Sequence, residues 1–151
     1  MFGKFVLFMV MALFSLSARA QEPCPPDVPC GGTQRFMEHG NVKWSDERTV
    51  LDHLADSFRK SKNQVIYFLI YPGQSSCNDE ARLRAMRAKK YLVRHHKISR
   101  SDIVWKSGGF RQDLSVEIWL LRKDKPLPEP STFITIDPSQ VHRSRKCKGL
   151  T

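Results

Sequence analysis

The run Val65–Tyr71 (VIYFLIY) decides the fold of this chain. Its seven residues are aliphatic or aromatic, and no charged or amide side chain interrupts them. Successive side chains of a strand point to opposite faces of a sheet, so an uninterrupted apolar run is typical of a strand buried on both faces. Pro72 and Gly73 end the run, because neither residue continues a central strand well. The sequence therefore predicts a central strand at Val65–Tyr71, covered by helices on one side.

A first amphipathic helix is predicted before this strand. Ser45 is a suitable N-cap, and Asp46 and Glu47 place negative charge in the first turn, where the helix dipole favours it. The apolar stripe that follows consists of Val50, Leu51, Leu54, Ala55 and Phe58. This spacing fits one face of a helix of about four turns.

A second helix is predicted after the strand, from about Asn78 to His96. Its apolar stripe consists of Ala81, Ala85, Ala88 and Leu92. Small alanines let a helix lie close to a sheet. The other faces of this helix are basic and carry Arg82, Arg84, Arg87, Lys89, Lys90, Arg94 and Lys97. Such a cluster is usually a solvated face, but it can also contact anionic polymers or lipid head groups.

The remaining elements are short strands. Thr33–Met37 is a weak strand candidate, Ile103–Lys106 is a short strand, and Ser115–Leu121 alternates apolar and polar side chains. We expect the last two to form a hairpin, and Thr132–Ile136 can add an edge strand. The predicted order is β-α-β-α-β-β. It defines a two-layer α/β (α+β) sandwich, with a mixed sheet and two helices on one face.

The first twenty residues have the pattern of a secretory signal peptide. Lys4 supplies the positive charge, Phe5–Phe14 the apolar run, and Ala18-Arg19-Ala20 the cleavage site. The apolar run is shorter than the ~20 residues that span a bilayer, so no transmembrane segment is expected after cleavage. The predicted organisation is a signal peptide at 1–20, a Pro/Cys-rich arm at 21–32, a folded domain at 33–122, and a Pro-rich linker with a basic tail at 123–151.

Export also determines how the four cysteines are interpreted. Cys24, Cys30, Cys77 and Cys147 all follow the signal peptide, and an even number in an oxidising compartment predicts two disulfides. Three pairings are open, and we expect the bonds to tie the arm and the tail to the domain. The spacing contains no CxxC pair and no paired histidines of the kind that bind zinc, so no metal site is predicted.

Several motifs after the central strand match a known family. These are Arg84-Ala85, Tyr91-Leu92-Val93, Ile98, Ile103, Gly108 and Val116-Glu117-Ile118. Together with the element order, they resemble the OmpA-like C-terminal domain family, over roughly Thr33–Leu121. The resemblance implies the two-layer fold described above and a place in the cell envelope.

The resemblance also implies a ligand site. Members of that family typically bind peptidoglycan through an aspartate after the central strand and the arginine of the Arg-Ala pair, which together hold the ammonium and carboxylate of one zwitterionic group. Arg84 matches that arginine. The acid available here is Asp79, which lies nearer to the arginine than the family's aspartate does. The candidate ligand residues are therefore Arg84 and Asp79, with Arg87 of the basic face beside them.

Enzyme signatures are missing from the sequence. It contains no G-x-S-x-G, no H-E-x-x-H and no phosphate-binding loop, so we expect neither catalytic residues nor a cofactor. The net charge of +10 would suit nucleic acid, but export argues against that partner. We expect an exported, non-catalytic binding module that lies in the periplasm or the outer-membrane envelope, or is secreted. Its expected ligand is peptidoglycan or another anionic wall component. The alternative is a structural or protein-interaction domain that has the OmpA-like fold without its ligand site.

Overall fold

The structure is a computed structural model that describes residues 34–142, Cys147 and Leu150. The predictions for the signal peptide, the arm, Cys24 and Cys30 lie outside these residues. The elements are β1 (Gln34–His39), α1 (Trp44–Arg59), β2 (Gln64–Tyr71), α2 (Glu80–His96), η1 (Arg100–Asp102), β3 (Ile103–Ser107), β4 (Ser115–Arg122) and η2 (Pro138–Gln140). This order confirms the predicted β-α-β-α-β-β arrangement.

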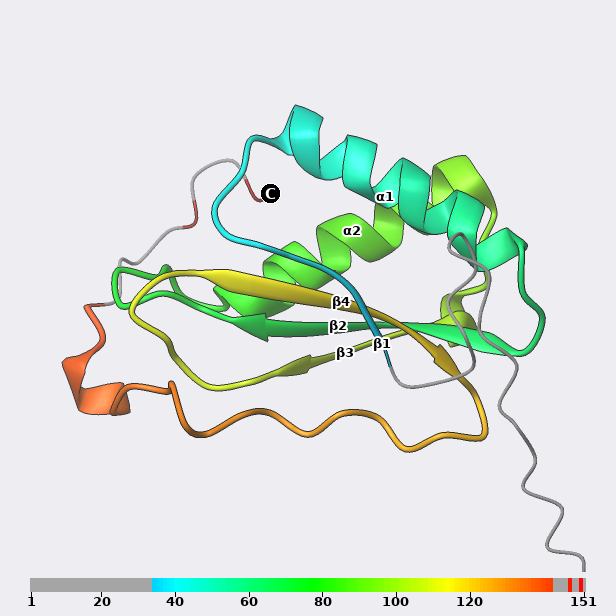
Figure 1. Ribbon diagram of the computed structural model, residues 1–151. Coiled ribbons are helices and arrows are strands. Elements are labelled where there is room, and N and C mark those ends of the chain that lie inside the picture. Colours follow the sequence, from blue (N-terminus) through cyan, green and yellow to red (C-terminus); the bar gives the residue numbers. More distant parts are fainter. Residues whose placement is uncertain (1–33, 143–146, 148–149, 151) are drawn as a thin grey trace, which may run out of the picture. The chain divides into compact units, whose positions relative to one another are not determined.

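The four strands form one mixed sheet in the order β1-β4-β2-β3 (Figure 1). β2 pairs in parallel with β3 and antiparallel with β4, while β1 pairs antiparallel with β4 along the edge. The predicted hairpin between the last two strands is wrong, because β3 and β4 lie on opposite sides of β2. The connection between them crosses the end of β2, where Gly108 N donates to Ile70 O over 2.9 Å and Arg111 N to Pro72 O over 3.0 Å.

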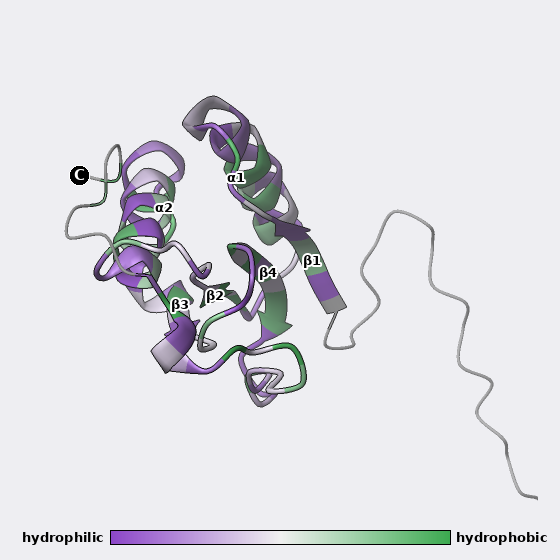
Figure 2. Cartoon of the chain, turned by 90° about the vertical axis from the view of Figure 1, so that its left-hand side faces the viewer, coloured by the Kyte–Doolittle hydropathy of each residue, from purple (hydrophilic) through white to green (hydrophobic). Residues whose placement is uncertain are grey.

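Both helices cover one face of the sheet and lie side by side there (Figure 2). The core between the layers is apolar. From the helices it takes Leu51, Leu54, Ala55, Ala81, Ala85, Ala88 and Leu92, and from the strands Ile66, Phe68, Ile70, Ile103, Val116, Ile118 and Leu120. The apolar stripes predicted for the two helices therefore face the sheet. The start of α1 differs from the prediction, in which Ser45 was the N-cap. The helix begins at Trp44, and its N-cap, Lys43, makes no side-chain hydrogen bond to the first turn.

The opposite face of the sheet is covered by the chain that follows β4 (Figure 1, orange). Buried side chains of β2 and β4 lie on this face, including Tyr67 and Tyr71. The Tyr67 hydroxyl donates to the carbonyl oxygen of Pro128 over 3.3 Å, and the backbone N–H of Ser131 donates to the Tyr71 hydroxyl over 3.1 Å. The segment predicted as a linker therefore closes the second face of the sheet.

The tail is fixed at three further points. Ile136 N donates to Phe110 O over 2.8 Å, and His142 N donates to Gln74 O over 2.8 Å. Thr132–Ile136 is not an edge strand as predicted; Ile136 makes only an isolated bridge to Phe110, because the chain turns at Thr132–Thr135. The Cys77–Cys147 disulfide then ties the tail to the loop before α2, which confirms the expectation that a disulfide holds the tail.

Candidate functional site

Arg84 lies between α2 and the β1–α1 loop and is buried, rather than on an open surface. Its side chain is 8% exposed, and its Nε donates to Glu80 Oε1 over 2.9 Å. Its Nη2 donates to the amide oxygen of Asn41 over 2.9 Å. The charge of the predicted carboxylate anchor is therefore already paired within the chain.

Asp79 and Arg87, the other two candidate ligand residues, pair with residues other than Arg84. Asp79 precedes α2 with a left-handed backbone (φ 60°), and its carboxylate contacts Arg82 over 3.4 Å. Arg87 pairs with the buried carboxylate of Glu47 on α1, and its guanidinium carbon lies 4.4 Å from the centre of the Trp44 ring. The structure thus does not bring Arg84, Asp79 and Arg87 together around one ligand position.

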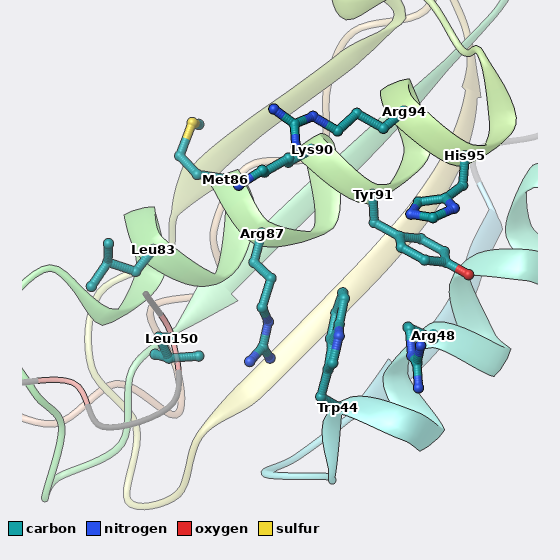
Figure 3. A pocket seen from close by; sticks show the side chains of 10 residues that line it. All are labelled: Trp44, Arg48, Leu83, Met86, Arg87, Lys90, Tyr91, Arg94, His95 and Leu150. Carbon is teal, nitrogen blue, oxygen red and sulfur yellow. The ribbon is translucent and has the colours of Figure 1, made fainter.

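Of the three, Arg87 lies in a groove between α1 and α2, which we call the α1–α2 groove (Figure 3). Its volume is about 480 Å³. It is lined by Trp44 and Arg48 of α1, by Leu83, Met86, Arg87, Lys90, Tyr91, Arg94 and His95 of α2, and by Leu150 of the tail. The volume is within the range of ~300–1,000 Å³ that small-molecule sites occupy.

Aromatic rings form the wall of the groove near the end of α2. The Trp44 and Tyr91 rings meet edge to face with centroids 5.6 Å apart, and His95 stacks on Tyr91 at 4.6 Å. Below them, Asp52 of α1 accepts hydrogen bonds from the Tyr91 hydroxyl over 2.8 Å and from His96 Nε2 over 2.7 Å. These contacts join α1 to α2 and fix the position of the Tyr91 ring.

The hydrogen bonds also shift two acid–base equilibria. Burial disfavours the ionised form of Asp52, but the hydrogen bonds from Tyr91 and His96, together with the charges of His96 and Arg48, hold its pKa below the ordinary value. The pKa of Tyr91 is raised, because its hydroxyl is hydrogen-bonded to Asp52, is partly buried and lies beside that carboxylate. Tyr91 therefore stays neutral and Asp52 stays ionised at ordinary pH.

The charged groups on the rim of the α1–α2 groove are cations. Lys90 and Arg94 are exposed and make no hydrogen bond or ion pair within the described part of the chain, and Arg48 likewise makes none, although its charge acts on Asp52. Both α2 residues belong to the basic face predicted from the sequence. By contrast, Lys89 of the same helix donates to the Ile103 carbonyl over 2.7 Å.

Trp44 and Arg48 could not be connected to this site from the sequence. Both residues come from α1, and only the packing of the two helices brings Trp44 against Arg87 and Tyr91 of α2. A signal was available in the spacing of Leu83, Arg87, Lys90 and Arg94, which places these four side chains along one face of α2.

A second polar cluster that the sequence analysis missed lies between β1, β4 and the loop before β4. Arg111 is 9% exposed and donates to Glu117 Oε1 over 2.9 Å and to Ser115 Oγ over 2.9 Å. Its guanidinium carbon also lies 3.4 Å from the centre of the Tyr71 ring. Glu38 accepts from Ser115 Oγ over 2.7 Å. Arg111, Ser115 and Glu117 are buried and Glu38 is exposed, and together they join β1 to β4 and to the loop before β4.

Comparisons of the chain with family models, with curated proteins and with solved structures give no match. The OmpA-like resemblance therefore remains a prediction from the quoted motifs. Among residues 34–142, Cys147 and Leu150, no group of three or more histidines, cysteines or carboxylates is placed to hold a metal ion. No helix in this part of the chain has both the length and the hydropathy needed to cross a membrane.

Proposed function

We propose that the protein is an exported, non-catalytic binding module of the cell envelope, and that it contacts an anionic envelope component such as peptidoglycan through the α1–α2 groove. The observation that carries this proposal is that three cations, Arg48, Lys90 and Arg94, line one groove and make no hydrogen bond or ion pair with residues 34–142, Cys147 or Leu150. Cations without partners attract an anionic polymer strongly at low ionic strength, because no internal carboxylate has to be displaced.

The test is binding to purified sacculi at two salt concentrations. The Lys90→Gln/Arg94→Gln variant removes two charges from the groove, while Lys62→Gln/Lys125→Gln removes the same charge from exposed positions outside it. We expect the groove variant to lose most of its binding at low salt and the control to lose little. Equal losses in both variants would assign binding to net charge, and no sacculus binding at low salt would overturn the proposal.

The arginine clamp that the resemblance implies makes a different prediction. If Arg84 itself holds a carboxylate, then Arg84→Ala should weaken sacculus binding by about 1.5–3 kcal/mol, with modest salt dependence. Because the same change leaves Glu80 without its partner, the thermal midpoint of the variant must be measured beside its binding. Unchanged binding in a folded Arg84→Ala protein would exclude the clamp and leave the groove.

One observation favours the alternative function, a structural or protein-interaction domain. Arg84 donates to Glu80 and to Asn41, as expected of a domain in which this position supports the fold. Under this alternative, Arg84→Ala lowers stability, and neither the parent chain nor the variant binds sacculi at low salt. Loss of binding at equal stability would contradict it.

A further inference from the structure

The turn at Thr132–Thr135 presents two large apolar side chains to solvent. Its central residues are Phe133, which is 95% exposed, and Ile134, which is 51% exposed. The turn is closed by Thr135, whose backbone N–H and hydroxyl both donate to the Thr132 carbonyl, over 3.4 and 2.9 Å. We call the side chains of Phe133 and Ile134 the apolar tip.

The apolar tip is fixed to the rest of the fold by the residues that follow it. Ile136 forms its bridge to Phe110, and Thr135 lies so close to Gly109 that a Cβ atom there would be 3.4 Å from Thr135 Cγ2. An apolar group that is held in place loses little conformational freedom on binding, and aromatic side chains are enriched in protein interfaces. The tip is therefore a preorganised anchor for a protein contact.

The segment around the apolar tip is acidic, although the chain as a whole is basic. Pro126–Val141 contains Glu129 and Asp137 and no lysine or arginine, whereas the net charge of the chain is +10. Glu129 pairs with Lys106, but Asp137 makes no ion pair within the described residues. Hydrogen bonds from the hydroxyl and the backbone N–H of Ser139 hold the pKa of Asp137 below its ordinary value. The tip is thus followed closely in the chain by an ionised carboxylate.

The α1–α2 groove has the complementary chemistry. No carboxylate is among the described residues that line it, and its charged side chains are all basic. Lys90 and Arg94 are directed along α2 toward Met86 (Figure 3). The Trp44 and Tyr91 rings supply apolar surface between the two helices. An occupant that matches this lining presents an apolar side chain with an acidic group near it.

We propose that the protein associates head to tail with copies of itself, so that the apolar tip of one copy occupies the α1–α2 groove of the next. Within one chain, the tip belongs to the segment that covers one face of the sheet, and the groove lies between the helices that cover the other (Figure 1). Each copy therefore uses its tip and its groove with two different neighbours. Such a heterologous contact continues from copy to copy unless the rotation between copies closes a ring.

This inference goes beyond the proposed function, because it gives the α1–α2 groove a second occupant. A neighbouring copy and an anionic envelope component would compete for the same basic and aromatic surface. Self-association would thus determine how many grooves are open to the envelope.

Sedimentation velocity of the oxidised chain, over a wide range of concentrations, tests the proposal. The average mass of the parent should rise with concentration. Phe133→Ser/Ile134→Ser removes the tip, and Lys90→Glu/Arg94→Glu reverses two charges of the groove. Each variant should weaken association at least tenfold, and each should keep the thermal midpoint of the parent because all four side chains are exposed. A parent that is monomeric at every concentration, or a tip variant that associates like the parent, overturns the proposal.

A charge control separates the groove from net charge. Lys60→Glu/Lys62→Glu makes the same change of charge at exposed positions outside the tip and the groove. This control should associate within twofold of the parent. A control that loses as much association as the groove variant would overturn the proposal.

Mixing the two variants identifies a head-to-tail contact. The tip variant keeps an intact groove and the groove variant keeps an intact tip, so an equimolar mixture should form a 1:1 dimer that does not grow further with concentration. A symmetric contact between two tips would instead give dimers of the groove variant alone and no association in the mixture beyond these dimers, which overturns the proposal.

The outcomes for this inference and for the proposed function are separable. Self-association without sacculus binding would retain the inference and remove the proposed function. Sacculus binding by a chain that stays monomeric at every concentration would retain the proposed function and overturn the inference.

Discussion

The two faces of the sheet are closed in different ways. The face under α1 and α2 is sealed by aliphatic and aromatic side chains at helical spacing. The other face is covered by an irregular segment, held by hydrogen bonds to two tyrosines and bordered by the buried Arg111–Glu117 pair. The first face depends on the hydrophobic effect, which is non-directional, whereas the second also depends on directional polar contacts. Different perturbations should therefore destabilise the packing on each of the two faces.

The largest effect is expected from a charge on the helix-covered face. Phe68 of β2 is 2% exposed within the apolar core, so Phe68→Asp buries a carboxylate without a partner. We expect a loss of several kcal/mol, which is comparable with the whole stability of a small domain. Urea unfolding measures it, and Phe133→Asp is the matched control because Phe133 is 95% exposed. Equal stability of both variants would remove β2 from the centre of the sheet.

A smaller effect is expected from breaking the buried pair beside the tail-covered face. Glu117→Ala leaves the buried Arg111 guanidinium with Glu38, at 3.3 Å, as its remaining carboxylate partner, which should cost about 1–3 kcal/mol. The double variant Arg111→Leu/Glu117→Leu should recover much of that loss, because an apolar pair does not require desolvation of charge. Glu129→Ala is the control. Its exposed ion pair with Lys106 should contribute less than about 1 kcal/mol. A double variant no more stable than Glu117→Ala would contradict this account.

The smallest effect is expected from alkaline pH, which should destabilise the tail-covered face through Tyr67. Burial, with the charge of Glu129 next, raises the pKa of Tyr67 to about 12. A group whose pKa is raised on folding contributes stability that is present below its unfolded pKa of 10 and is lost as the pH rises toward 12. Tyr67→Phe should cost about 1 kcal/mol at neutral pH, through the bond to Pro128, and should remove this part of the alkaline destabilisation.

Urea unfolding of the parent and of Tyr67→Phe at pH 9 and pH 11.5 gives the comparison. The parent should lose more free energy of unfolding between the two pH values than the variant does. Identical losses would mean that Tyr67 is not the group that couples alkaline pH to the tail-covered face.

The helix-covered face could be predicted from the sequence because its residues repeat with the periods of a helix and a strand. Leu51 and Leu54 in α1 and Ala81 and Ala85 in α2 give that signal. The tail-covered face gives no periodic signal, because the hydrogen bonds from Tyr67 to Pro128 and from Ser131 to Tyr71 join residues about sixty positions apart. A proline-rich segment has the same composition whether it leaves a domain or covers it.

The candidate site also has a part that could be predicted from the sequence and a part that could not. The basic face of α2 was predicted, because it needs only the geometry of one helix. Arg84 is predicted as a ligand residue from a motif alone. The sequence cannot show that its guanidinium already donates hydrogen bonds to Glu80 and Asn41. Trp44 and Arg48 were missed because their place opposite α2 depends on how two helices pack.

The Cys77–Cys147 disulfide also determines how the protein responds to mechanical tension. A pulling force applied beyond Cys147 enters the fold at Cys77, because the covalent bond bypasses the chain between the two cysteines, which are 70 positions apart. α2, β3, β4 and the segment over the tyrosines are therefore shielded from that force. The load passes instead into β2, an interior strand that pairs with β4 on one side and with β3 on the other. An attachment at this end of the chain would thus pull on an interior strand of the sheet and leave the irregular cover in place.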